Sequence, residues 1–207
     1  GSSVGEFTAH FTKLAKDGIG VNYGSLLGHG TVRSAVMGTA ARHPTSAELG
    51  RMQQLVEKAM GEGAFGISTG LIYVPGTYAK TEEIVALARA AKKHGGLYVS
   101  HMRNEGDNVL DAIDEALRIG QETGISVHLS HLKASGKNNW GRSKQIVARI
   151  KNARARGMRV TGDQYAYTAS STSLDVLFPA KELQITRGRF AKKLNDSPDF
   201  RKKMHRS

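Results

Sequence analysis

Two histidines occupy matching positions in this sequence, and both are of the type that binds transition metals. His101 and His131 each follow a serine at the end of an apolar run, 30 residues apart. Neutral imidazole is a good ligand for zinc, and a catalytic zinc needs about three protein ligands with one position open for water. The pair therefore predicts half of a zinc site, to be completed from other strands. The alternative is that each histidine only hydrogen-bonds to a neighbour at its strand end.

The two imidazoles are expected to point the same way. Side chains alternate between the two faces of a strand. This alternation places His101 on the side of Val99 and His131 on the side of Leu129. We therefore expect both rings to lie close enough to share a metal ion.

Other residues near these strand ends could bind a substrate. Lys133 lies two residues past His131, where it could hold a carboxylate as a point charge. Tyr73 precedes a Pro-Gly turn, and residues 163–171 carry two tyrosines and several hydroxyls just past another strand. Hydroxyl donors orient anionic or carbonyl groups. The alternatives are an exposed loop lysine and simple turn formation.

The elements that must position these residues alternate between β-rich runs and amphipathic helices. We predict strands over residues 19–29, 64–71, 96–103, 125–131 and 158–168. Thr45 and Glu48 form a capping box at the start of one helix, and Thr81 is expected to cap the next. Further helices are expected over residues 107–124 and from about 143 to 157, the latter with Val147 facing inward.

The spacing of the strand ends predicts the architecture. Gly70, His101, His131 and Asp163 follow one another at 31, 30 and 32 residues. A parallel βα barrel of eight units averages roughly 31 residues per unit. Five strands cannot close such a barrel, so we predict the α/β class with a partial, incomplete TIM-like barrel. A doubly wound sheet would also alternate strands and helices, and periodicity alone does not exclude it.

The composition is that of a globular domain. The 207 residues are 39% hydrophobic and 23% charged, and there is no cysteine, so neither disulfides nor thiolate metal ligands are available. There is no apolar run of membrane length and no leader pattern at the beginning of the sequence, which favours a cytoplasmic protein without a membrane partner.

The net charge of +12 raises the question of nucleic-acid binding. The basic residues are spread over helix faces and the C-terminal tail, and no aromatic residues interleave with them as a stacking platform would require. We therefore expect no nucleic-acid partner. A non-catalytic basic binding module remains the alternative to an enzyme.

Several ordered motifs resemble those of a known family. The motifs are Ser-Thr-Gly-Leu-Ile-Tyr-Val-Pro-Gly at 68–76, Ser-His-Met-Arg-Asn-Glu at 100–105, Ser-His-Leu-Lys-Ala-Ser-Gly at 130–136 and Asp-Gln-Tyr-Ala-Tyr-Thr-Ala-Ser-Ser at 163–171. Together they resemble the D-aminoacylase family, the N-acyl-D-amino-acid deacylases of the metal-dependent amidohydrolase superfamily. The resemblance covers most of the chain, from about residue 20 to residue 174.

The resemblance implies a βα barrel with one or two zinc ions that hydrolyses the amide bond of an N-acyl-D-amino acid. It implies that His101 and His131 are metal ligands on the fifth and sixth barrel strands. The positions that match substrate contacts are Tyr73, Lys133, Tyr165 and Ser171. In the implied mechanism, zinc polarises the acyl carbonyl and activates a water, and an aspartate is the general base.

The sequence departs from the family pattern in three ways. The His-X-His pair of the first strand, the cysteine ligand and the catalytic aspartate of the last strand are not found, and Asp163 lies one strand too early for that aspartate. We therefore expect residues 3–207 to form one partial barrel domain, roughly strands three to seven of a longer catalytic domain, and interpret residues 1–2 as a cloning remnant. No catalytic residue is expected within the chain.

Two expectations follow for the isolated chain. It should bind zinc poorly and show no hydrolysis, and its open barrel edges should promote self-association.

The other candidates within the superfamily are dihydroorotase-like or hydantoinase-like enzymes. These usually carry a carboxylated lysine on the fourth strand, and residues 64–71 contain no lysine.

Overall fold

The protein is built on one open sheet of five parallel strands. The computed structural model describes residues 6–185 and 187–204. The strands are β1 (Leu27–Gly28), β2 (Gly66–Gly70), β3 (Leu97–His101), β4 (Ser126–Leu129) and β5 (Val160–Gly162). They lie in the order β1-β2-β3-β4-β5, and every neighbouring pair is parallel. The prediction of five parallel strands joined by crossover helices is confirmed.

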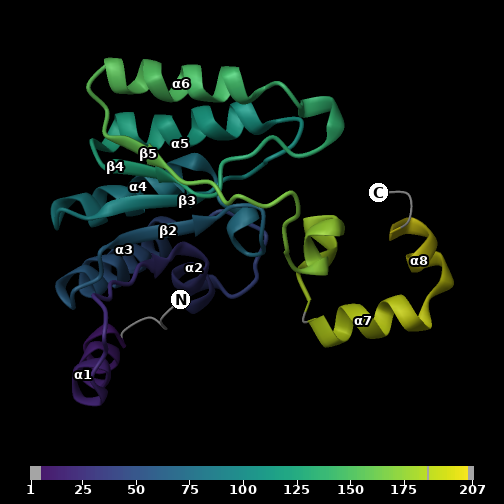
Figure 1. Ribbon diagram of the computed structural model, residues 1–207. Helices are drawn as coiled ribbons and strands as arrows, with labels where there is room; N and C mark the ends of the chain where they lie inside the picture. Colours follow the sequence, from purple (N-terminus) through teal and green to yellow (C-terminus); the bar gives the residue numbers. More distant parts are fainter. Residues whose placement is uncertain (1–5, 186, 205–207) are drawn as a thin grey trace.

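Helices connect the strands and line one side of the sheet (Figure 1). Helices α2 (His29–Met37) and α3 (Ser46–Gly61) join β1 to β2, and the later crossovers are α4 (Thr81–Lys93), α5 (Val109–Thr123) and α6 (Ser143–Ala155). Helix α1 (Phe7–Asp17) precedes the sheet. The elements at the chain end and in the loops are η1 (Gly76–Tyr78), η2 (Lys137–Asn139), η3 (Leu174–Leu177), η4 (Ala180–Leu183), α7 (Arg187–Asp196) and α8 (Pro198–Met204). Helices α7 and α8 extend away from the sheet (Figure 1).

Local sequence signals explain some helix starts and not others. The capping box of α3 is present, since the Thr45 hydroxyl accepts from the Glu48 N–H and the Glu48 carboxylate accepts from the Thr45 N–H. The expected Thr81 cap is wrong. Lys80 precedes α4 and makes no side-chain cap, while the Thr81 hydroxyl donates to the Glu115 carboxylate on α5 at 2.9 Å. A partner on a neighbouring helix therefore competes with the cap.

The hydrophobic core lies between the sheet and the helices. Strand residues Ile67, Tyr98 and Leu129 are buried on the side that the helices cover. The other face of the sheet is only half-buried, for example at Val99. In contrast to the prediction, Val147 is 48% exposed, because α6 packs through other positions. No helix in the described part of the chain has both the length and the apolar character needed to cross a bilayer.

The two outer strands are shorter than predicted. Residues 19–26 are not a strand, and β1 has only two residues. At the other edge β5 has three residues instead of the eleven expected over 158–168. An edge strand has ladder hydrogen bonds on one side only, and within the described residues each of these strands pairs with a single neighbour.

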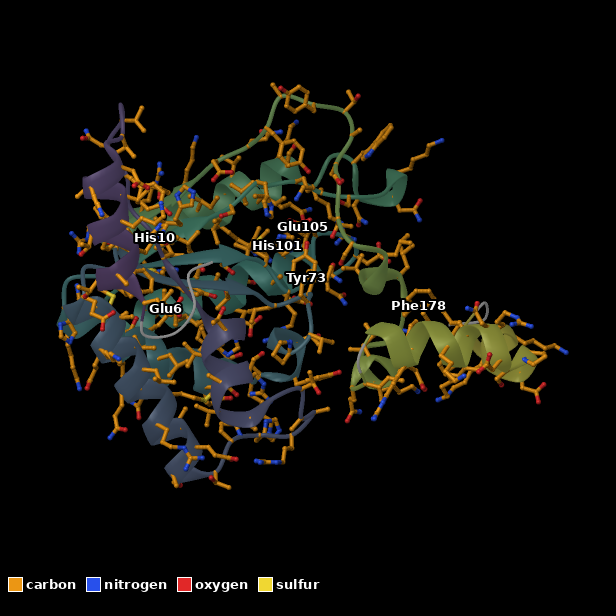
Figure 2. The ribbon with its side chains drawn as sticks, turned by 90° about the horizontal axis from the view of Figure 1, so that it is seen from below. Glu6, His10, Tyr73, His101, Glu105 and Phe178 are labelled. Carbon is orange, nitrogen blue, oxygen red and sulfur yellow. The ribbon has the colours of Figure 1, made fainter. Side chains whose placement is uncertain are left out.

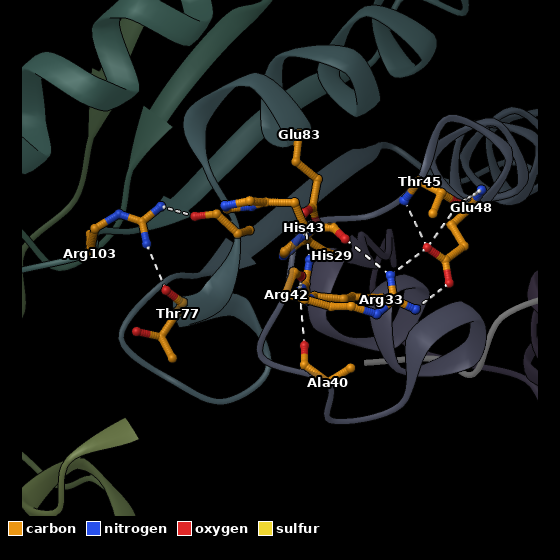
Figure 3. Close-up of polar contacts among 11 residues, drawn as sticks. His29, Arg33, Ala40, Arg42, His43, Thr45, Glu48, Thr77, Glu83 and Arg103 are labelled. Atoms are coloured by element: carbon orange, nitrogen blue, oxygen red, sulfur yellow. Dashed lines mark hydrogen bonds and ion pairs between the residues drawn. The ribbon is translucent and has the colours of Figure 1, made fainter. Parts of the chain in front are cut away.

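A buried ionic cluster ties the first crossover to α4 (Figure 3). His29 and Arg33 lie one turn apart on α2, and both are fully buried. His29 Nε2 lies 2.7 Å from one Glu83 oxygen, and Arg33 donates to the other at 2.5 Å. Burial raises the pKa of Glu83, but the hydrogen bonds and charges of His29 and Arg33 outweigh it, so the pKa lies below the usual 4.5. His29 is thus part of the structural framework.

Candidate metal centre

The residues singled out in the sequence come together where the strands end. Parallel βα folds gather functional side chains at the carboxyl ends of their strands. A cavity of about 170 Å³ lies there, and Figure 2 shows Tyr73, His101 and Glu105 beside one another. All six predicted site residues are among those that line this cavity, namely Tyr73, His101, His131, Lys133, Tyr165 and Ser171.

The two histidines face each other across a hydrogen-bonding distance. His101 is the last residue of β3, and its Nδ1 lies 2.8 Å from His131 Nε2. The ring centroids are 4.5 Å apart and the ring planes are tilted by 71°. The prediction that the two rings approach each other agrees with this geometry. Their role as metal ligands remains a prediction.

Strand alternation was expected to orient His131 toward His101, and this expectation is wrong. Val127 and Leu129 are buried on the helix side of β4, whereas His101 shares the half-buried face with Val99. Simple alternation would therefore send His131 to the wrong face. Strand β4 ends at Leu129, and the His131 backbone takes a φ of 40°, the positive value that few non-glycine residues adopt. This break in the strand turns the imidazole toward His101.

A carboxylate that the sequence interpretation did not single out completes the cluster. Glu105 Oε1 lies 2.9 Å from His131 Nδ1 and 2.5 Å from the Lys133 ammonium. The signal was present, because Glu105 follows His101 by four residues within one of the recognised motifs. Since Lys133 can only donate, its 3.0 Å contact with His131 Nδ1 competes with donation from that nitrogen to Glu105.

Two tyrosines flank the histidine pair. The Tyr73 ring lies 5.0 Å from that of His101, and its hydroxyl is 2.9 Å from the Thr172 hydroxyl. The Tyr165 ring lies 6.3 Å from that of His131, and the Lys133 ammonium is 5.4 Å from the Tyr165 centroid. The cavity is therefore bounded by aromatic rings on both sides of the imidazoles.

The electrostatics favour a neutral imidazole at His101. Burial, together with the charges of His131 and Lys133, lowers the pKa of His101 below 6.5 and outweighs the opposing effect of the Glu105 carboxylate. A neutral ring keeps a lone pair available for a metal. A neutral His101 therefore has no proton to release before it binds a cation.

The donor set fits a metal ion. One ligand atom from each of His101, Glu105 and His131 lies within 4.8 Å of the others. His101 Nε2 is buried and has no hydrogen-bond partner within the described residues. If a metal is bound at His131 Nε2, the proton must sit on Nδ1, where Glu105 can accept it. This histidine–carboxylate arrangement is the usual support of a metal-bound imidazole.

A larger apolar cavity adjoins the cluster. Its volume is about 520 Å³, and it shares Ile72, Tyr73 and Val176 with the smaller cavity. Its remaining wall includes Phe178 and Phe190 from the segment that follows β5. The cluster therefore lies beside a space that would favour an apolar group.

The chain is similar in sequence to known deacylases. The chain is 42% identical over 168 residues to a D-aminoacylase of Alcaligenes xylosoxydans xylosoxydans, covering 81% of this chain and 34% of that protein. It is 42% identical over 165 residues to an N-acyl-D-glutamate deacylase of the same organism, covering 80% and 33%. No protein-family model matches the sequence. The chain thus spans about a third of the length of the curated relatives it matches.

Solved structures with the same fold contain metals. A D-aminoacylase structure that addresses a binuclear metal centre matches with a TM-score of 0.78 at 41% identity, covering 83% of this chain and 37% of that one. An N-acyl-D-glutamate deacylase from Bordetella bronchiseptica, complexed with zinc and a phosphonate mimic of the tetrahedral intermediate, matches with a TM-score of 0.74 at 40% identity, covering 80% and 34%.

Proposed function

We propose that the protein containing this chain is a zinc-dependent deacylase of N-acyl-D-amino acids, since the chain is similar to D-aminoacylases and N-acyl-D-amino-acid deacylases over about a third of their length. The observation that carries the proposal is the His101–His131 pair, two imidazole nitrogens 2.8 Å apart at the strand ends. Further ligands and the general-base aspartate are proposed to come from parts of the protein outside this chain. The chain itself then corresponds to roughly strands three to seven of the catalytic barrel.

The six predicted site residues and Glu105 take distinct roles in the proposed reaction. His101 and His131 hold zinc, and Glu105 accepts the Nδ1 proton of His131 so that the Nε2 lone pair stays free. When bound, zinc supplies polarisation of the acyl carbonyl and a lowered pKa of a bound water. Lys133 binds the substrate carboxylate. The hydroxyls of Tyr73, Tyr165 and Ser171 orient the same substrate.

The adjoining cavity indicates the kind of substituent that the substrate carries. Its walls are formed mainly by apolar side chains such as Leu174, Phe178 and Phe190. Burial of apolar surface stabilises a bound group, whereas a carboxylate placed there would lose its hydration. We therefore propose that an apolar side chain or acyl chain occupies this space.

The assay that tests the proposal uses the complete protein loaded with zinc. N-acetyl-D-leucine is expected to be hydrolysed to acetate and D-leucine, faster than its L enantiomer and faster than N-acetyl-D-glutamate. A chelator should abolish the reaction, and added zinc should restore it. If the protein binds zinc stoichiometrically but hydrolyses none of these amides, the deacylase proposal is wrong.

Replacement of Lys133 tests the substrate-binding role separately from stability. Lys133→Met should raise KM about 10- to 100-fold, because a charge-assisted hydrogen bond contributes roughly 1.5–3 kcal/mol. The free energy of unfolding should fall by no more than about 1 kcal/mol, since the Lys133–Glu105 pair is partly exposed. Steady-state kinetics and urea unfolding give the two values.

The matched control is Lys137→Met, which removes an exposed lysine from η2 in the adjacent loop. It should leave KM and stability within experimental error of the wild type. Equal losses of substrate binding and stability in Lys133→Met would instead assign Lys133 a structural role.

A further inference from the structure

The backbone N–H of His131 has an unusual partner. It donates to the Asp163 side chain, with 2.5 Å between His131 N and Asp163 Oδ1. The neighbouring amides donate to main-chain carbonyls instead. Ser130 donates to the Ser100 carbonyl on the β3 side, and Leu132 donates to the Asp163 carbonyl on the β5 side. The one amide at the break in the strand is therefore bound by a side chain.

The pattern is that of an extra residue inserted in a strand. Successive amides of a parallel strand donate alternately to the two neighbouring strands. Here two donations, from Ser130 and Leu132, are separated by His131, which contributes no backbone N–H to the ladder. Such insertions re-aim side chains and occur next to functional sites. The His131 φ of 40° falls at this insertion.

The second carboxylate oxygen of Asp163 also has a hydrogen-bonding partner, His128. Asp163 Oδ2 lies 2.7 Å from His128 Nε2, and His128 Nδ1 lies 2.8 Å from the Thr161 hydroxyl. His128 and Thr161 are direct partners in the β4–β5 register. Asp163 follows Thr161 by two residues, so its carboxylate lies above the same face. The chain of contacts runs from the β4–β5 pair through Asp163 to the backbone of His131.

We propose that Asp163, held by His128, is a positioning residue that keeps the His131 backbone in its left-handed conformation and so aims the imidazole at His101. This inference rests on the proposed metal centre. A left-handed backbone is unfavourable for a non-glycine residue, so the conformation persists only where a surrounding contact compensates. The hydrogen bond to a carboxylate is the contact that can do so, because hydrogen bonds to charged groups are stronger than those between neutral groups.

Hydrogen exchange of the metal-free protein tests the backbone part of the inference. In Asp163→Ala, the His131 amide should exchange at least about 10-fold faster than in the wild type, because its acceptor is gone. The amides of Ser130 and Leu132 donate to carbonyls and should keep their rates. Asp163→Asn retains an acceptor oxygen and should restore most of the protection at His131.

Zinc affinity tests the consequence for the site. Loss of a residue that orients a metal-binding histidine typically weakens metal binding about 10- to 100-fold. Asp163→Ala in the complete protein should therefore raise the zinc Kd by that factor, measured by competition with a chelator, and Asp163→Asn should recover most of the affinity. The control is Asp114→Ala, which removes a similarly exposed carboxylate that pairs with Arg149 between α5 and α6. Its zinc Kd should match the wild type.

Two results would overturn the inference, namely an unchanged His131 exchange rate or an unchanged zinc Kd in Asp163→Ala. A wild type that binds no zinc would overturn the proposed metal centre instead. In that case the exchange rates still decide whether Asp163 holds the His131 backbone.

Discussion

Replacing His101 and His131 together by alanine is expected to abolish tightly bound zinc and to reduce hydrolysis by more than about 100-fold. Residues that only support metal ligands already affect affinity or activity about 10- to 100-fold, so removal of two ligands should exceed that range. The physical reason is that no other histidine is among the described residues that line this cavity, where His101 Nδ1 and His131 Nε2 are 2.8 Å apart. Metal analysis and steady-state kinetics on the complete protein measure the effect.

The matched control replaces His43 and His94 by alanine. Both are exposed and lie away from the cavity. This variant should keep its zinc and its activity, and both double variants should unfold at similar urea concentrations. Full retention of zinc and activity after loss of His101 and His131 would remove the metal-site proposal.

The second large effect is expected on stability, in Glu83→Leu. This change leaves the fully buried Arg33 guanidinium without its counter-ion, and breaking a buried ion pair in this way costs about 3–5 kcal/mol. Urea unfolding of the purified variant measures the loss. A further Arg33→Met change should recover part of it, because the uncompensated charge is then removed.

Glu82→Gln provides the control from the same turn of α4. The Glu82 side chain is 64% exposed and pairs with Arg118 on the surface. Such pairs contribute about 0–1 kcal/mol, so the variant should be nearly as stable as the wild type. A loss below about 1 kcal/mol in Glu83→Leu would mean that Arg33 finds another partner or reaches water.

The buried ionic cluster of His29, Arg33 and Glu83 predicts a loss of stability in acid. The pKa of Glu83 in the folded protein lies below its usual value of 4.5. A carboxyl with a depressed folded-state pKa contributes stability that is fully present above its unfolded-state pKa and is lost as the pH falls through the folded-state pKa. The wild type should therefore lose more stability below about pH 4.5 than Glu83→Leu does, in urea titrations at several pH values.

Local patterns in the sequence were sufficient for much of the fold. Period-two and period-3.6 hydrophobic repeats depend only on neighbours along the chain, and they predicted five parallel strands with crossover helices. The capping box at Thr45 and Glu48 was confirmed for the same reason. Predictions failed where a residue distant in the sequence determines the local structure. The Thr81 hydroxyl donates to Glu115 and does not cap its helix. The outer strands are short, and each has a single neighbour in the described residues.

For the candidate site too, some features could be predicted from the sequence and others could not. Residue identities were enough to nominate the candidate site, because the Ser-His endings, Lys133 and the tyrosines stand out in the sequence. The contacts between these residues form only in the folded sheet. Folding pairs Glu105 with Lys133 and turns His131 out of strand alternation through Asp163, and outside the site it joins Glu83 to His29, 54 residues away. Such contacts depend on folding free energies summed over the whole sheet, which no local pattern contains.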